Sequence, residues 1–279
     1  MKKKLSLVLA TLMLLGLLAG CGGQPAASGD KDTVVVYIGD IFNSMTPYMT
    51  TANSDQAVFD QVYETLTVTK DDGTVAPCLA KSWKMSDDCL EYTFQLEEGV
   101  KFHNGEVMTA DDVVYSFEQY LANPAKNNFV SMIDKVEMVD ANTVKVTLNK
   151  ITPLFLVYIN ELPILNKKFV EEHNGNISDV ACGTGPYKLT SIDLATSAML
   201  ERNDDYRLAP AAIEKVELRY VGDRSTASVQ LETGDLDIMS IDPSQLVSFE
   251  NNDKFTVEKV QTLKTALLAI NTTVAPLDN

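Results

Sequence analysis

The sequence predicts an α/β protein. Residues 33–38 (TVVVYI) and 265–270 (TALLAI) are unbroken apolar runs, which are typical of strands buried on both faces of a sheet. Residues 90–96 instead alternate between apolar and polar side chains, which is the period of a strand with one face in the core. Segments with helical spacing lie between these strands, so that strands and helices interleave along the chain.

Residues 79–121 form the best defined of these units. Asn104-Gly105 favours the positive φ angles of a tight hairpin turn after the short run at 100–103. Thr109 then suits the N-cap of a helix, with Asp112 three residues later as its capping-box partner. Apolar side chains follow on one face of that helix as far as Leu121. The core residues expected from this unit include Phe94 and Phe117.

The remaining elements are predicted from the same periodicities, interrupted by turn-forming residues. Helices are expected at 54–63, 154–159, 166–173 and 225–233, with Thr152 and Ser225 as the N-caps of the second and the fourth. Strands are expected at 64–69, 135–139, 143–148, 188–192, 198–201, 215–220 and 237–239.

Composition limits the class of protein. The chain has 279 residues, of which 45% are hydrophobic and 22% charged, so it is globular and could hold one large or two small domains. Its formal net charge of −16 argues against binding of nucleic acid and against broad adhesion to anionic lipid. An acidic surface of this kind is typical of a soluble protein outside the cell.

The N-terminus reads as an export signal. Three lysines at 2–4 precede an apolar run at 5–18 that is too short for a standard membrane span. The run ends in Leu-Ala-Gly-Cys21, which resembles a bacterial lipobox and predicts cleavage before Cys21 and acylation of its thiol. An ordinary secretory signal or a short anchor helix is the alternative. We therefore expect a lipoprotein signal peptide at 1–20 and a flexible tether at 21–32.

The remaining cysteines and the search for catalytic motifs give no sign of an enzyme. Cys78 and Cys89 flank a predicted hairpin, where they could form a disulfide or stay as free thiols. With Cys182 and two histidines their spacing fits no zinc site, so we expect no metal and no cofactor. No nucleophile elbow or zinc-protease motif is present, and the paired acids fall at turns or at a helix start. A secreted hydrolase is kept as an alternative.

Four segments carry a resemblance to a known family. They are the pattern LA-SW…YTF-L--GVKFHNGE--TADDVVYSFE at 79–118, GTGPY at 183–187, RN-DY at 202–206 and L--GDLDI at 231–238. Together they resemble the family 5 extracellular solute-binding proteins, the peptide and nickel receptors of ABC importers. The resemblance implies a lobe with the type II fold of periplasmic binding proteins, which contains a mixed sheet and a smaller α+β subdomain.

The resemblance also implies a domain organisation. Residues 33–52 and 182–270 would form the core sheet of the first lobe, with 53–181 as an inserted α+β subdomain. Residues 271–279 would begin the crossing to a second lobe, which is missing from this chain. We therefore expect the chain to be the N-terminal portion of a two-lobed receptor, and a complete single-lobe protein is the alternative.

The loop at 39–51 is the first candidate for a ligand site. It follows a buried strand and carries apolar side chains, so it either borders the ligand cleft, as in the family, or folds back onto the core. The ligand-binding residues implied by the resemblance are Phe42, Asn43, Ser44, Phe129, Asn271 and Thr272.

The function implied by the resemblance is capture of a small solute, most often a peptide, and its delivery to the permease subunits of an ABC importer. The receptor would be a monomer, held by its lipid anchor at the extracytoplasmic face of the bacterial cell membrane, with no nucleic-acid partner. A lipoprotein of the same fold that serves in adhesion, signalling or chaperoning is the other alternative.

Overall fold

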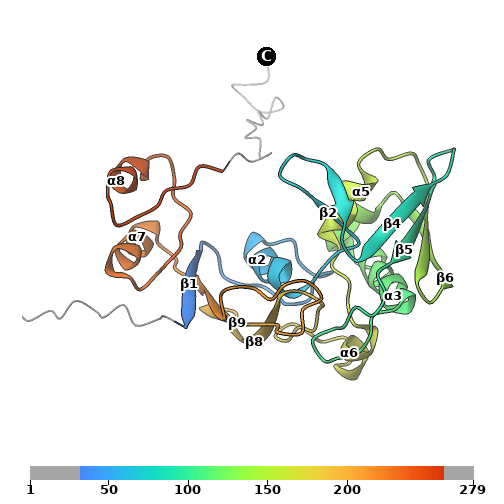
Figure 1. Cartoon of the computed structure of the whole chain (residues 1–279), viewed down its shortest axis with the longest axis horizontal. Coiled ribbons are helices and arrows are strands. Elements are labelled where there is room, and N and C mark those ends of the chain that lie inside the picture. The colour runs from blue at the N-terminus through green and yellow to red at the C-terminus, as the bar shows by residue number, and fades with distance from the viewer. Residues whose placement is uncertain (1–31, 261–279) are drawn as a thin grey trace, which may run out of the picture. The chain divides into compact units, whose positions relative to one another are not determined.

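The computed structural model describes residues 32–260 (Figure 1). This part of the chain forms two compact units, which divide between Met239 and Ser240. The second unit contains α8 (Leu246–Glu250), and Phe249 packs edge to face against Phe255 there. None of the helices within the described residues combines the length and the apolar character needed to cross a membrane.

The first sheet is mixed, as predicted. It contains β1 (Thr33–Ile38), β8 (Tyr187–Asp193), β9 (Ser197–Arg202) and β10 (Lys215–Tyr220) in the order β1-β10-β9-β8. β1 runs parallel to β10, whereas the other two pairs are antiparallel. The predicted strand at 237–239 contributes only an isolated parallel bridge between Ile238 and Val36.

Both faces of β1 are covered, as its unbroken apolar run predicts. Val35 and Tyr37 belong to a small core that includes Ala227 of α7 (Arg224–Thr233). Val36 and Ile38 pack against the main core on the other face. Since consecutive strand residues point to opposite faces, a strand between two cores needs apolar residues at every position.

The second large sheet confirms the alternating pattern. It is built from β4 (Ala80–Met85), β5 (Glu91–Leu96), β6 (Ile133–Asp140) and β7 (Thr143–Leu148), antiparallel throughout in the order β4-β5-β7-β6. Along β5 the apolar side chains are buried and the polar ones are partly exposed. α3 (Ala110–Leu121) packs against β6 and β7, and Phe94 and Phe117 are both 0% exposed.

The turn that leads into α3 matches the prediction except at one residue. Gly105 has a φ of +87°, but Asn104 is not among the described residues with positive φ. Its side chain instead accepts the Glu106 N–H at 3.1 Å, which closes a local turn. Thr109 donates through its N–H (2.9 Å) and its hydroxyl (3.1 Å) to Asp112 Oδ2, so the predicted capping partner is confirmed.

Shorter elements surround the two sheets. They are α2 (Asn53–Val62), β2 (Thr67–Thr69), β3 (Val75–Pro77), η1 (Pro124–Lys126), α4 (Asn127–Val130), α5 (Phe155–Tyr158), η2 (Ile159–Glu161) and α6 (Lys167–Glu172). Two predicted N-caps are wrong. The N-cap of α5 is Leu154 rather than Thr152. α7 is capped by Asp223 rather than Ser225, because the Asp223 carboxylate reaches the Thr226 N–H at 2.8 Å.

The chain passes between the two large sheets at two adjacent places. The first follows α2, and the second is residues 182–186 (CGTGP), immediately before β8. The Gly185 N–H donates to the Val62 carbonyl at 2.9 Å. A Cβ atom on Gly183 would lie 2.0 Å from Val62 O, and one on Gly185 would lie 2.5 Å from Gln61 O. The two crossings are thus in close contact, which only glycine permits at positions 183 and 185.

One hydrophobic core extends through both sheets. It includes Val58 of α2, Phe94 of β5 and Leu200 of β9. α2 packs against β8, so this core joins the part of the chain that carries the second sheet to the first sheet. The division of residues 33–270 into a core sheet and an inserted subdomain stays a prediction.

Candidate functional site

The loop after β1 is held from inside by a buried carboxylate. Asp55 of α2 is 0% exposed. One of its oxygens accepts the Asn43 N–H at 2.7 Å. The other accepts the Thr50 hydroxyl at 2.7 Å and the Ser44 N–H at 3.4 Å. Charged acceptors make strong hydrogen bonds and are costly to bury without donors, so Asp55 fixes the course of residues 39–52, here called the β1 loop.

The side chains of the β1 loop divide between the core and the surface. Phe42 and Met45 are 2% and 0% exposed and belong to the main core, so the alternative that this loop folds back is correct for them. The ring of Phe42 is consequently not available at a rim. Asn43 is exposed and Ser44 is partly exposed, while Met49 is 58% exposed.

The backbone N–H groups of the β1 loop donate to other parts of the protein. The Phe42 N–H donates to Leu194 O at 2.9 Å and the Met45 N–H to Ser178 O at 2.8 Å. Within residues 32–260, no hydrogen bond reaches the carbonyl oxygens of residues 42–44. The loop therefore offers acceptors, which suit a ligand that carries N–H donors.

The far end of the β1 loop lies against the C-terminal end of α3. Met49 Sδ accepts from Asn123 Nδ2 at 3.0 Å. The rings of Tyr48 and Tyr120 pack edge to face, with centroids 6.4 Å apart. The loop thus connects the edge of the first sheet with the segment that carries Phe129.

Phe129 lies beside a buried lysine. It is partly buried, and its ring packs edge to face with Tyr158 at 6.4 Å. Lys126 is 1% exposed, with its Nζ 5.6 Å from the centroid of the Phe129 ring. The Nζ donates to Glu161 O at a long 3.5 Å. An ammonium group has three donors, so this cation is held mainly by one weak hydrogen bond and one aromatic face.

Burial lowers the pKa of Lys126, and the nearby Glu161 raises it. A buried titratable group with a shifted pKa is a typical functional candidate. Sequence reasoning missed this residue, because Lys126 lies among Asn, Pro and Ala, where a lysine normally points into water. The spacing of three residues between Lys126 and Phe129 was the available signal.

The cysteine prediction is decided in favour of free thiols. Cys78 and Cys89 are unbonded, so the possible disulfide between them is not formed. Cys78 follows β3, whereas Cys89 lies in the β4–β5 turn at the far end of the six-residue β4. At about 3.3 Å per residue, this strand alone separates them by roughly 20 Å, far beyond the reach of a disulfide. Within residues 32–260, no group of three metal-binding side chains is found.

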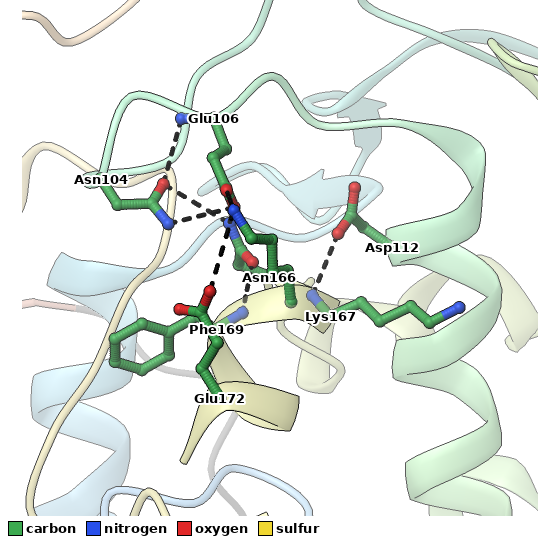
Figure 2. A network of polar contacts seen from close by, with 8 residues as sticks. Asn104, Glu106, Asp112, Asn166, Lys167, Phe169 and Glu172 are labelled. Atoms are coloured by element: carbon green, nitrogen blue, oxygen red, sulfur yellow. Dashed lines mark hydrogen bonds and ion pairs between the residues drawn. The ribbon is translucent and has the colours of Figure 1, made fainter. Parts of the chain in front are cut away.

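A second polar cluster joins the turn before α3 to α6 (Figure 2). Asn166 caps α6 and donates to Glu106 at 2.9 Å, while the Lys167 N–H donates to Asp112 at 3.0 Å. Lys168 pairs with Glu106. An open pocket of about 410 Å³ beside this cluster is lined by Glu106, Val107, Thr109, Asp111, Asp112, Asn166, Lys167, Lys168 and Glu171. Since both lysines have carboxylate partners, we interpret the cluster as a joint between two helices.

Three predicted site residues lie outside the described residues. They are Cys21, the proposed lipidation site, and Asn271 and Thr272. Of the others, Asn43 and Ser44 lie at the surface of the β1 loop, and Phe129 lies beside Lys126. Met49 at the far end of the β1 loop contacts Asn123, which lies just before the segment that carries Phe129.

The comparisons with known proteins agree on one family. Residues 74–279 match the model of the bacterial extracellular solute-binding proteins, family 5. The heme-binding protein A of Haemophilus influenzae is 28% identical, over 100% of this chain and 58% of its own length. The nickel-binding periplasmic protein of Escherichia coli is 30% identical, over 83% of this chain and 46% of its own length.

Solved structures give the same fold. The periplasmic binding protein DppA from Helicobacter pylori, in complex with the peptide STSA, is 27% identical with a TM-score of 0.72, over 79% of this chain and 49% of that one. Such neighbours are type II periplasmic binding proteins, which confirms the predicted fold class. The chain spans about half the length of the curated relatives it matches. It belongs to the bacterial extracellular solute-binding proteins, family 5.

Proposed function

We propose that this chain is the first portion of an extracytoplasmic receptor that captures peptides and delivers them to the permease of an ABC importer. Family membership supports the class of function. The observation that supports the ligand site is the contact of Met49 in the β1 loop with Asn123, which lies just before the Lys126–Phe129 pair. The receptor would act as a monomer, and no nucleic acid takes part.

The chemistry of the two ends of this site favours a peptide. The carbonyl oxygens at 42–44 would accept hydrogen bonds from an ammonium or amide N–H of the ligand. Lys126 is 1% exposed, so its ammonium would pair with a ligand carboxylate only after the segment that covers it moves aside, and its long 3.5 Å hydrogen bond to Glu161 O makes that exchange favourable. The relatives are named for heme and nickel as well as for peptides. We favour a peptide over these other ligands because a peptide carries a charged group at each end. Asn271 and Thr272 are proposed as further contacts.

An uptake assay tests this proposal. Cells that lack the gene should accumulate less of a labelled tripeptide, and the wild-type gene should restore uptake. Lys126→Met keeps the side-chain length but removes the charge, and we expect uptake to fall by about tenfold or more at limiting peptide, since a buried charged partner is lost. The matched control is Lys81→Met, because the Lys81 side chain is 39% exposed in a surface ion pair.

Two results would contradict the proposal, and each contradicts a different part of it. If deletion of the gene leaves peptide uptake unchanged, peptides are not the solute. If Lys126→Met restores peptide uptake as fully as wild type does, peptides are the solute but the binding site lies elsewhere. A melting temperature for Lys126→Met at or above that of wild type excludes misfolding as the cause of any loss, because removal of a poorly paired buried charge does not destabilise a fold.

The membrane anchor is proposed from the Leu-Ala-Gly-Cys21 motif alone. Cys21→Ser removes the thiol to which lipid would be attached, and we expect the variant to leave the membrane fraction for the soluble fraction, since stable anchoring needs the acyl chains. Immunoblots of the two fractions measure this. A Ser variant that stays with the membranes as fully as wild type would support an uncleaved anchor helix instead.

A further inference from the structure

His103 bridges the second crossing between the two sheets. The Gly183 N–H points at its Nδ1 at 3.3 Å, and its Nε2 lies 3.0 Å from the Gly185 carbonyl oxygen. A carbonyl can only accept and an amide can only donate, so the proton of the neutral ring is on Nε2 and the lone pair is on Nδ1. The His103 N–H also donates to Gly183 O at 2.8 Å.

These contacts join three parts of the fold at one point. His103 lies in the turn between residues 100 and 107, which belongs to the part with the second sheet. Residues 182–186 lead into the first sheet, and Gly185 N–H is bonded to Val62 O at the end of α2. The ring therefore fastens the hairpin turn to the second crossing, which is itself bonded to the first through Gly185 and Val62.

We propose that His103 is a pH-sensitive clamp that releases the Gly183 N–H, and so loosens residues 182–186 against the hairpin turn, when Nδ1 takes up a proton. Protonation converts Nδ1 from an acceptor into a donor that faces the donor of Gly183. The hydrogen bond between them is lost, and the charged ring favours water over its partly buried position. The backbone bond from the His103 N–H to Gly183 O and the bond between Gly185 and Val62 remain, so the change loosens residues 182–186 locally, at the Gly183 N–H.

The surroundings of the ring determine the sign of the pH effect. Burial lowers the pKa of His103 to about 4, while the hydrogen bond to Gly185 O opposes this shift. Lys188 lowers the pKa further and Glu64 raises it. The other titratable groups nearby are Tyr63 at the end of α2, Cys182 in the crossing and Glu106 in the hairpin turn.

A released ring with the ordinary pKa binds more protons than the clamped ring between pH 6.5 and 4, so the clamp is strongest above pH 6.5 and weakens as the pH falls. From these two pKa values, release should be about twentyfold more frequent at pH 5 than at pH 7.

Hydrogen exchange on the full chain tests the clamp. Amide protection of residues 183–185 is measured at pH 7 and pH 5 and corrected for the intrinsic pH dependence of exchange. In wild type we expect the protection of the Gly183 amide, which donates to Nδ1, to fall by about twentyfold on acidification. In His103→Gln, which keeps an amide donor but does not titrate, protection should be independent of pH. His173→Gln is the matched control, because His173 lies at the end of α6 and should leave the wild-type response intact.

Several outcomes would overturn the proposal. If the amide protection of wild type is equal at both pH values, the ring has no role. The same holds if protection falls on acidification as much in His103→Gln as in wild type. If His103→Gln fails to fold, ¹⁵N shifts of the imidazole in wild type decide the matter. A proton on Nδ1 at pH 7, or titration of the ring near pH 6.5, would exclude the clamp.

Discussion

Replacement of Gly183 by alanine is expected to lower the free energy of unfolding by about 4 kcal/mol or more. The added Cβ would lie 2.0 Å from Val62 O and 2.8 Å from Tyr63 Cδ1, so either crossing must move. Movement of Gly183 would also break its two backbone contacts with His103. Because Val62 O already accepts from Gly185, no small shift relieves the overlap and preserves the hydrogen bonds.

Gly222→Ala is the matched control. A Cβ there would meet only the end of the Tyr220 side chain, at 3.0 Å, and this side chain can turn aside. We expect a loss below about 1 kcal/mol for the control, within the usual range of surface substitutions. Urea denaturation followed by circular dichroism measures both. A Gly183→Ala protein as stable as Gly222→Ala would show that residues 182–186 do not pack against α2 as described.

Truncation of Phe117 to alanine should lower the free energy of unfolding by about 3–5 kcal/mol, the usual range for a buried phenylalanine. Phe117 is 0% exposed on α3 and lies in the core shared by both sheets. The loss combines the transfer of a large ring to water in the unfolded chain with the cavity left behind, and close-packed surroundings on a sheet cannot collapse to fill it.

The same helix supplies a control for this effect. Leu121 also lies on α3 but is 39% exposed. Leu121→Ala should therefore lower the free energy of unfolding by about 1 kcal/mol or less, since a partly exposed side chain buries less apolar area on folding. Equal losses for the two variants would mean that α3 faces the core differently from the arrangement described.

Local patterns in the sequence predicted the regular elements well. The alternation along β5 and the buried run of β1 are set by side chains within each strand, so they are visible without knowledge of the rest of the chain. The pairing of Thr109 with Asp112 spans three residues and was equally visible. The N-cap of α7 was missed because Asp223 and Ser225 are both good capping residues, and only the geometry of the preceding turn selects Asp223.

The residues of the candidate site were harder to predict from local sequence patterns. Asn43 and Ser44 were found through the position of the β1 loop after a buried strand and through the family resemblance. The role of Asp55 was missed, because its bonds to these two residues cross 11 and 12 positions of irregular chain. Lys126 was missed because nothing in its neighbourhood indicates that η2 covers it.

The sequence by itself determined the fold class, the family and the hairpin with its helix. Only the tertiary structure decided that Phe42 lies in the core and that Lys126 is buried beside Phe129. It also decided that the ring of His103 contacts the backbone of residues 182–186. The physical reason is the same in each case. Periodicity and capping depend on residues within a few positions of one another, whereas burial depends on which distant segment packs on top, and that is settled when the whole core closes.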